Sequence, residues 1–135
     1  MTSRTEIMAQ LLSMKLEEHL RAMETIEGIA RELASTDMSS RSPEELRDAV
    51  SRLRSLRSAL LKDALRVVDA IENGDITPGG DGVEELYALA GYYVEAAYHS
   101  EKRLLSMLGG YVDDSDRQSM ELLRSVFSRI LSSLE

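Results

Sequence analysis

The chain has 135 residues, of which 43% are hydrophobic and 30% are charged, and its formal net charge is -8 at pH 7. This balance is typical of a globular chain that is long enough to bury one sizeable core. The absence of cysteine excludes disulfide bonds and thiolate chemistry, and the excess of negative charge argues against broad binding to nucleic acid or anionic membranes. No apolar run is long enough to span a membrane and the first ten residues lack the apolar core of a signal peptide, so we expect a cytoplasmic protein.

Two helix-start signals precede long segments of periodic apolar residues in the first half of the chain. Ser3 is followed three residues later by a glutamate, and Ser42 is followed by Pro43 and then, at the third position, by another glutamate. A serine at the cap accepts a hydrogen bond from a backbone N–H that has no partner within the helix. Proline suits the first helical position because an N–H there would be unpaired anyway. These signals predict helices over about 3–35 and 42–73.

Two further start signals lie in the second half of the chain. Asp81 and Ser115 are each followed three residues later by an acidic or amide side chain, which is the spacing of a capping box. The pair Gly109-Gly110 is typical of a helix end, because glycine readily adopts the left-handed conformation that closes a helix. The signals predict helices over about 82–109 and 115–134.

Each predicted helix has one apolar face at helical spacing. The fourth is the clearest, with apolar positions at Met120, Leu123, Val126, Phe127, Ile130, Leu131 and Leu134. Helices with one apolar face and short connections pack side by side in alternating directions. The sequence therefore predicts an all-α protein: a four-helix antiparallel up-down bundle with short loops, forming a single domain over residues 1–135.

Three polar residues interrupt the predicted apolar faces. His19 lies on the face of the first helix, Arg57 on that of the second and Glu101 on that of the third. Counted along alternating helices, all three fall near the middle of the bundle. Because a buried charge is costly unless it is paired and hydrogen-bonded, we expect Arg57 to bridge to Glu101, with His19 bonded nearby.

Three interpretations of this cluster remain open at the level of sequence. It is a structural polar layer that fixes helix register or lies at a dimer seam. Alternatively, it is a ligand-binding or catalytic site, because clusters of titratable residues mark such sites. In the third interpretation, Arg57 extends its long side chain to solvent and no cluster forms.

The spacing of histidines and acids does not match the common metal sites of helical bundles. Di-iron and di-manganese bundles use Glu-x-x-His, but Leu16 stands three residues before His19, and Ala96 three before His99. Two histidines without cysteine also do not form the usual structural zinc sites. We predict no metal, no cofactor and no catalytic residues.

Two surface features are candidates for interaction. Tyr92 points away from the predicted core of the third helix, and an exposed aromatic side chain there suggests a contact surface. The second helix carries several arginines that could form a basic strip facing phosphates: Arg47, Arg52, Arg54 and Arg66. The acidic remainder of the chain argues against such a nucleic-acid interface.

We therefore favour a non-catalytic interaction or assembly subunit over an enzyme. Two alternatives are a bundle that binds or converts a small polar or anionic ligand at His19, Arg57 and Glu101, and an accessory subunit of a nucleoprotein complex that uses the basic strip. The apolar faces of the first two helices are longer than that of the fourth, so part of the first hairpin should be uncovered. We expect a homodimer or a larger protein complex to cover it, and no membrane partner.

Overall fold

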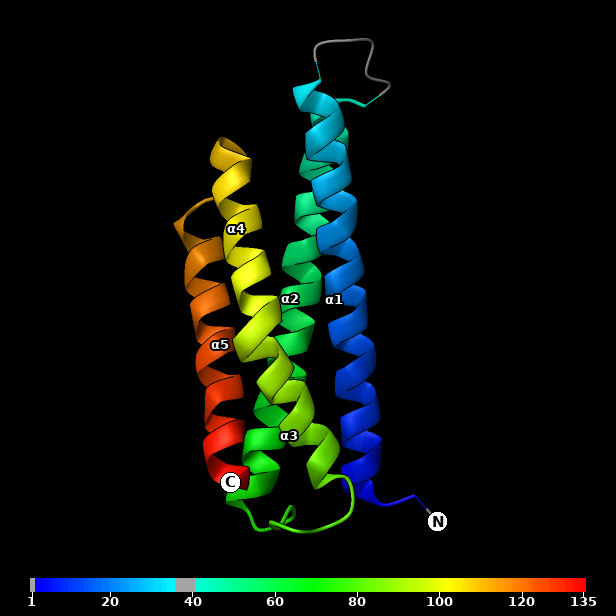
Figure 1. Cartoon of the computed structure of the whole chain (residues 1–135), viewed down its shortest axis with the longest axis vertical. Helices are drawn as coiled ribbons and strands as arrows, with labels where there is room; N and C mark the ends of the chain where they lie inside the picture. Colours follow the sequence, from blue (N-terminus) through cyan, green and yellow to red (C-terminus); the bar gives the residue numbers. More distant parts are fainter. Residues whose placement is uncertain (1, 36–40) are drawn as a thin grey trace.

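The computed structural model describes residues 2–35 and 41–135 and confirms the all-α class, a four-helix bundle (Figure 1). The helices are α1 (Arg4–Ala34), α2 (Pro43–Glu72), α3 (Val83–Tyr92), α4 (Tyr98–Leu108) and α5 (Asp114–Leu134). A π-helical turn, η1 (Tyr93–Ala97), joins α3 to α4 into one continuous third helix, and a short 3-10 turn, η2 (Gly109–Tyr111), follows α4.

The caps of the first two helices are those that the sequence predicts. Ser3 accepts a hydrogen bond from the backbone N–H of Glu6, and the Glu6 carboxylate accepts one from the Ser3 N–H in return. At α2 the Ser42 hydroxyl accepts from the backbone N–H of Glu45, with Pro43 at the first helical position. Each cap pairs a backbone donor that the helix itself leaves free.

The predicted caps of the last two helices are wrong. The cap of α3 is Gly82, not Asp81, and its side-chain position is closed because a Cβ there would lie 2.7 Å from the backbone N of Glu6. Gly82 also has φ of 84°, a left-handed conformation that favours glycine. At α5 the cap is Asp113, not Ser115, and its carboxylate accepts from the N–H groups of Ser115 and Asp116. At α3, close packing against α1 requires glycine at the cap position. At α5, the Asp113 carboxylate is better placed than the Ser115 hydroxyl to accept from the first backbone N–H groups.

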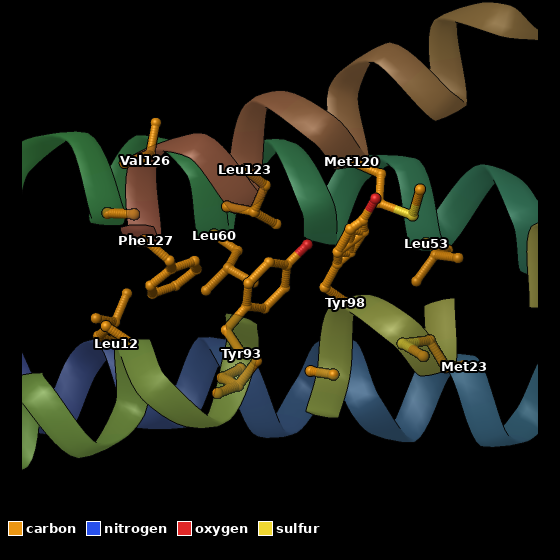
Figure 2. Close-up of a cluster of buried hydrophobic side chains, with 14 of the residues drawn as sticks. Leu12, Met23, Leu53, Leu60, Tyr93, Tyr98, Met120, Leu123, Val126 and Phe127 are labelled. Carbon is orange, nitrogen blue, oxygen red and sulfur yellow. The ribbon is translucent and has the colours of Figure 1, made fainter. Parts of the chain in front are cut away.

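The third helix contains a π turn where the sequence predicts regular helix. The backbone N–H of Tyr98 donates to the carbonyl of Tyr93, five residues earlier instead of four. This wider turn lets both tyrosines face the interior, where Figure 2 shows them among buried leucines. The Tyr93 ring stacks on Phe127 of α5, with ring centroids 4.6 Å apart.

The helices alternate in direction, but they are not all neighbours of the helix that follows them in the chain. α2 packs on α1 and α5, while the third helix also packs on α1 and α5. The third helix and α2 therefore lie at opposite corners of the bundle. The connection between them, residues 73–82, passes across the lower end of the bundle (Figure 1). Side chains from all four helices can therefore meet in one buried layer at the centre of the bundle.

The exposed apolar surface is not where the helix lengths place it. The far end of the first hairpin projects beyond α4 and α5 (Figure 1), but Ile29 and Leu46 are buried there, so among the described residues this end exposes no large apolar side chain. Large exposed apolar side chains lie instead in the first half of α1, at Ile7, Leu11 and Met14. Within the described ranges, no helix combines the length and the apolar character needed to cross a membrane.

Candidate functional site: a buried ionic layer

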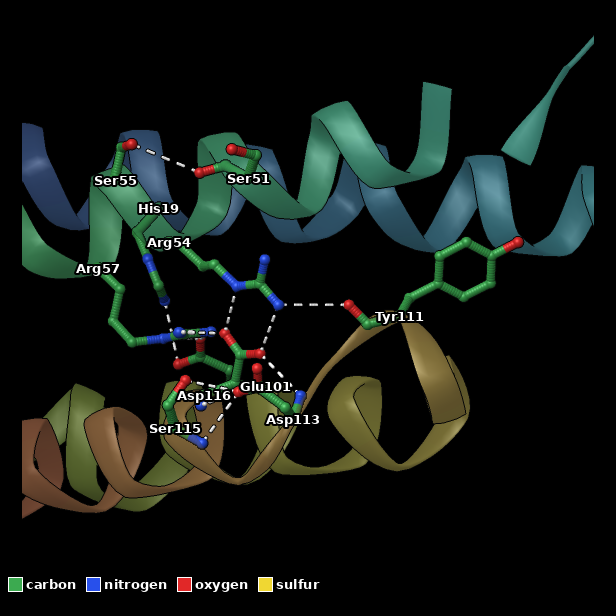
Figure 3. Close-up of polar contacts among 10 residues, drawn as sticks. All are labelled: His19, Ser51, Arg54, Ser55, Arg57, Glu101, Tyr111, Asp113, Ser115 and Asp116. Atoms are coloured by element: carbon green, nitrogen blue, oxygen red, sulfur yellow. Dashed lines mark hydrogen bonds and ion pairs between the residues drawn. The ribbon is translucent and has the colours of Figure 1, made fainter. Parts of the chain in front are cut away.

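Each of the four helices contributes one polar residue to the centre of the bundle (Figure 3). His19 comes from α1, Arg57 from α2, Glu101 from α4 and Asp116 from α5, and all four are at most 3% exposed. We call these four residues the ionic layer. The structure brings together the three residues that the sequence singles out, and it adds a fourth that the sequence analysis missed.

Glu101 lies between His19 and Arg57. Its Oε1 is 3.1 Å from Nε2 of His19, and its Oε2 accepts from Nε of Arg57 at 2.9 Å. Because an ionised carboxylate only accepts hydrogen bonds, His19 donates through Nε2–H. Burial alone would raise the pKa of Glu101, but the interactions with His19, followed by those with Arg57, outweigh it. The pKa of Glu101 therefore lies below its ordinary value, and the group is held ionised.

Asp116 closes the other side of the layer. Arg54 donates to both of its oxygens at 2.8 Å, from Nε and Nη2, and Arg57 donates from Nη1 at 3.1 Å. The backbone N–H of Asp113 adds a further bond at 3.0 Å, as part of the α5 cap. The bonds from Arg54, followed by those from Asp113 and Arg57, outweigh burial and hold the pKa of Asp116 well below its usual range.

Charges alternate along the whole network. It begins at Arg54, whose side chain is 44% exposed, and continues through Asp116, Arg57 and Glu101 to the buried His19. Two arginines face two carboxylates, so the formal charges of these four groups cancel. Pairing of this kind offsets the cost of removing ions from water.

The sequence contains one signal that Asp116 belongs to the core, which is its spacing from the apolar residues of α5. Positions 116, 120, 123, 127, 130 and 134 follow the alternating four- and three-residue steps of a core face, and all six are buried. Asp116 therefore lies on the same face as Leu123 and Phe127. The predicted start at Ser115 concealed this, because an acid in the first turn is usually explained by the helix dipole.

The surface residues that the sequence singles out have separate surroundings. Tyr92 is half exposed, at the seam between α1 and the third helix. Arg47 donates to Glu44 at 2.7 Å and lies over the ring of Tyr111, whereas Arg54 is bonded to Asp116. The structure therefore does not gather these two arginines into a free basic strip.

The arginines of α2 are largely used within the chain. Arg66 donates to Asp63 at 3.1 Å, in addition to the pairings of Arg47 and Arg54. A guanidinium already paired with a carboxylate gains less from a phosphate, because the first pair must be given up. The geometry thus gives a nucleic-acid interface on α2 no support.

The carboxylates of the ionic layer are occupied by hydrogen bonds within the chain. Each oxygen of its two carboxylates already accepts a hydrogen bond from within the chain. Five surface cavities, of about 220 to 620 Å³, are lined by none of the four layer residues. Among the described residues no group of three or more His, Asp or Glu side chains is arranged to hold a metal ion. Two buried polar atoms lack a hydrogen-bond partner in the same part of the chain: His19 Nδ1 and the Tyr93 hydroxyl.

Comparison of the chain with protein-family models, with curated proteins and with solved structures finds no match. What can be inferred about function therefore depends on the geometry of this chain alone.

Proposed function

We propose that the chain is a non-catalytic interaction or assembly subunit, which associates through the outer faces of its helices. The ionic layer supports this proposal indirectly, because its groups are bonded to one another and a structural role accounts for all four. A functional surface is then to be sought on the outside of the bundle.

The observation that carries the proposal is an apolar stripe on α1. Ile7, Leu11 and Met14 follow one another at steps of four and three residues, which places them on one side of the helix. They are 46%, 50% and 58% exposed, whereas Leu12 and Leu16 on the inward side are buried. Contiguous exposed apolar side chains are typical of association surfaces, whereas single ones are common on any protein.

A second copy of the chain is the partner that suits the stripe. In an antiparallel pairing of two α1 helices centred on Leu11, Arg4 of one copy lies opposite Glu18 of the other, because each is seven residues from Leu11. The two-fold symmetry repeats this complementary pair at both ends of the stripe. The side chain of Arg4 is 77% exposed and its contact to Asp75 is long, at 3.9 Å, so it can reorient.

Light scattering coupled to size exclusion tests the proposal. At micromolar concentration we expect a particle of twice the 15.1 kDa chain mass. Leu11→Glu should convert it to the monomer, because a carboxylate at the centre of an apolar contact loses its hydration. Leu122→Glu is the matched control: Leu122 is 51% exposed on α5 and should leave the mass unchanged. A wild-type particle of 15.1 kDa would contradict self-association.

A further inference from the structure

A second surface, distinct from the stripe, runs along the seam between α1 and the third helix. Two cavities open there and share Tyr92 as a lining residue. The first, about 420 Å³, has an apolar floor that includes Ala9, Ala88 and Leu89. The second, about 220 Å³, is floored by Leu20, Met23 and Leu104. We call the two cavities together the Tyr92 groove.

Every charged residue that lines the Tyr92 groove is a glutamate. Glu6 and Glu85 line the first cavity, and Glu24 and Glu27 line the second. Glu6 is bonded within the α1 cap and Glu27 is paired with Arg31. Glu24 and Glu85 have no ion-pair partner within residues 2–35 and 41–135. The groove thus joins an apolar floor to edges that carry uncompensated negative charge.

The length of α1 along which the two cavities lie matches that of a helix. From Glu6 to Glu27 α1 rises by ~30 Å at ~1.5 Å per residue, which is the length of a helix of about 20 residues. Tyr92 lines both cavities and is half exposed, and tyrosine is enriched among the interface residues that contribute most to binding.

We propose that the Tyr92 groove binds an amphipathic helix of a partner protein, with apolar residues on the floor and Lys or Arg along both edges. This inference rests on the proposed function as an interaction subunit and names the class of partner. A second copy of the chain does not suit the groove, because a two-fold axis would bring its glutamates together. Nucleic acid and anionic membranes are repelled for the same reason. Ile7, Leu11 and Met14 do not line the groove.

The test uses a labelled synthetic helix of leucine and lysine, with leucines on one face, and measures binding by fluorescence anisotropy. A scrambled peptide of the same composition, without an apolar face, controls for attraction to any acidic protein. A leucine–glutamate helix tests the sign of the charge. Tyr92→Ala removes the central aromatic, and Tyr87→Ala is its matched control, because Tyr87 is also exposed on α3 but does not line the groove.

We expect the leucine–lysine helix to bind at least tenfold more tightly than either control peptide. Tyr92→Ala should weaken that binding tenfold or more, and Tyr87→Ala less than twofold. Glu24→Lys with Glu85→Lys should also weaken it, whereas Asp48→Lys, on the exposed side of α2, should not. Equal binding of the helix and its scrambled form, or equal loss in the two tyrosine variants, would overturn the proposal. If no peptide binds while the wild-type particle is a dimer, the groove proposal fails and the interaction subunit stands.

Discussion

Each oxygen of the Asp116 carboxylate accepts two hydrogen bonds. Oδ1 accepts from Arg54 and Arg57, and Oδ2 accepts from Arg54 and from the backbone N–H of Asp113. These donors stabilise the ionised form, which is why the pKa of Asp116 is lowered. A carboxyl whose pKa is lower in the folded than in the unfolded state contributes stability above its unfolded pKa, and loses that contribution as the pH falls towards the folded value.

Asp116→Asn should therefore change both stability and its dependence on pH. At pH 6 we expect the variant to be less stable by about 2 kcal/mol, the scale of hydrogen bonds to a charged group. Below pH ~4, the ordinary pKa of aspartate, wild-type stability should fall more steeply than that of the variant, so that the two converge. Urea unfolding from pH 6 to pH 2.5 measures both effects.

The neighbouring residue supplies the control. Asp114 also lies in the first turn of α5, but its side chain is 95% exposed, so Asp114→Asn should remain close to wild type across the range. If Asp116→Asn instead parallels wild type below pH 4, the ion pairs of Asp116 do not contribute to acid sensitivity.

His19 ends the network and leaves one atom unsatisfied. Its Nε2–H donates to Glu101, but Nδ1 is buried with no hydrogen-bond partner among the described residues. Leaving a buried polar atom unpaired costs about 1–3 kcal/mol. Leucine would fill such a position without this cost, so the histidine is better explained by the specificity of its contact with Glu101 than by stability.

Sequence reasoning located three of the four layer residues, for an identifiable physical reason. His19, Arg57 and Glu101 each stand in the middle of a helix, where a polar side chain conflicts with an otherwise apolar face. Asp116 stands in a first turn, where acids are common, so its place on the core-face spacing of α5 was overlooked. The contact of the exposed Arg54 with the ionic layer could not be predicted, because only the packing of α2 on α5 brings its guanidinium to Asp116.

At the scale of the element, the π turn η1 corrects the register of the third helix. Buried positions Leu86 and Tyr93 are seven residues apart, as are Glu101 and Leu108, but Tyr93 and Glu101 are eight apart. A regular helix would rotate every position after the extra residue away from the core. The wider π turn absorbs that residue and returns Glu101 to the ionic layer.

Deleting one residue from the π turn should therefore be tolerated. Removal of the exposed Glu95 makes the separation of Tyr93 and Glu101 seven residues, so the third helix can become regular with its core face intact. We expect a cooperative thermal melt, with a loss of about 1 kcal/mol, typical of a modest change. Circular dichroism measures both the helix content and the melt.

Deletion of Lys102 is the matched comparison. Lys102 is also exposed but lies in regular helix, so its removal rotates Leu104, Leu105 and Leu108 away from the core. This variant should lose its cooperative transition. If the two deletions are equally damaging, the π turn does not set the register.

The helix caps show which features of a helix depend only on residues close in the sequence. Ser3 and Ser42 cap their helices because each acceptor and its donor are only three residues apart. Gly82 is a different case: the backbone of α1 occupies the space beside it. That contact joins residues distant in the sequence, so local spacing favoured Asp81 and could not reveal the glycine.

At the scale of the whole molecule, the sequence predicted the class of fold but not which helices touch. The alternating directions follow from four amphipathic helices and short connections. The diagonal placement of α2 and the third helix does not follow from the sequence. The connection through residues 73–82 can lead from α2 either to a neighbouring corner of the bundle or to the opposite one. Arg57 of α2 and Glu101 of α4 meet across this diagonal, so the ionic layer joins two helices that are not neighbours.

We interpret the ionic layer as structural, and Arg57 is the residue that connects its two carboxylates. Arg57→Met leaves Glu101 buried without its cation, and breaking a buried pair in this way typically costs ~3–5 kcal/mol. Replacing His19, Arg57 and Glu101 together by leucine and methionine leaves no unpaired charge among them, and Asp116 keeps its bonds to Arg54. A ligand site predicts the reverse: stable single variants that have lost a response to ligand.

The most direct measurement is the free energy of unfolding in urea for wild type, Arg57→Met and the triple variant His19→Leu, Arg57→Met, Glu101→Met. If the layer is structural, the single variant is the least stable of the three, by ~3–5 kcal/mol relative to wild type, and the triple variant recovers most of that loss. An Arg57→Met protein as stable as wild type, or a triple variant that is less stable than Arg57→Met, would show that the layer is not structural.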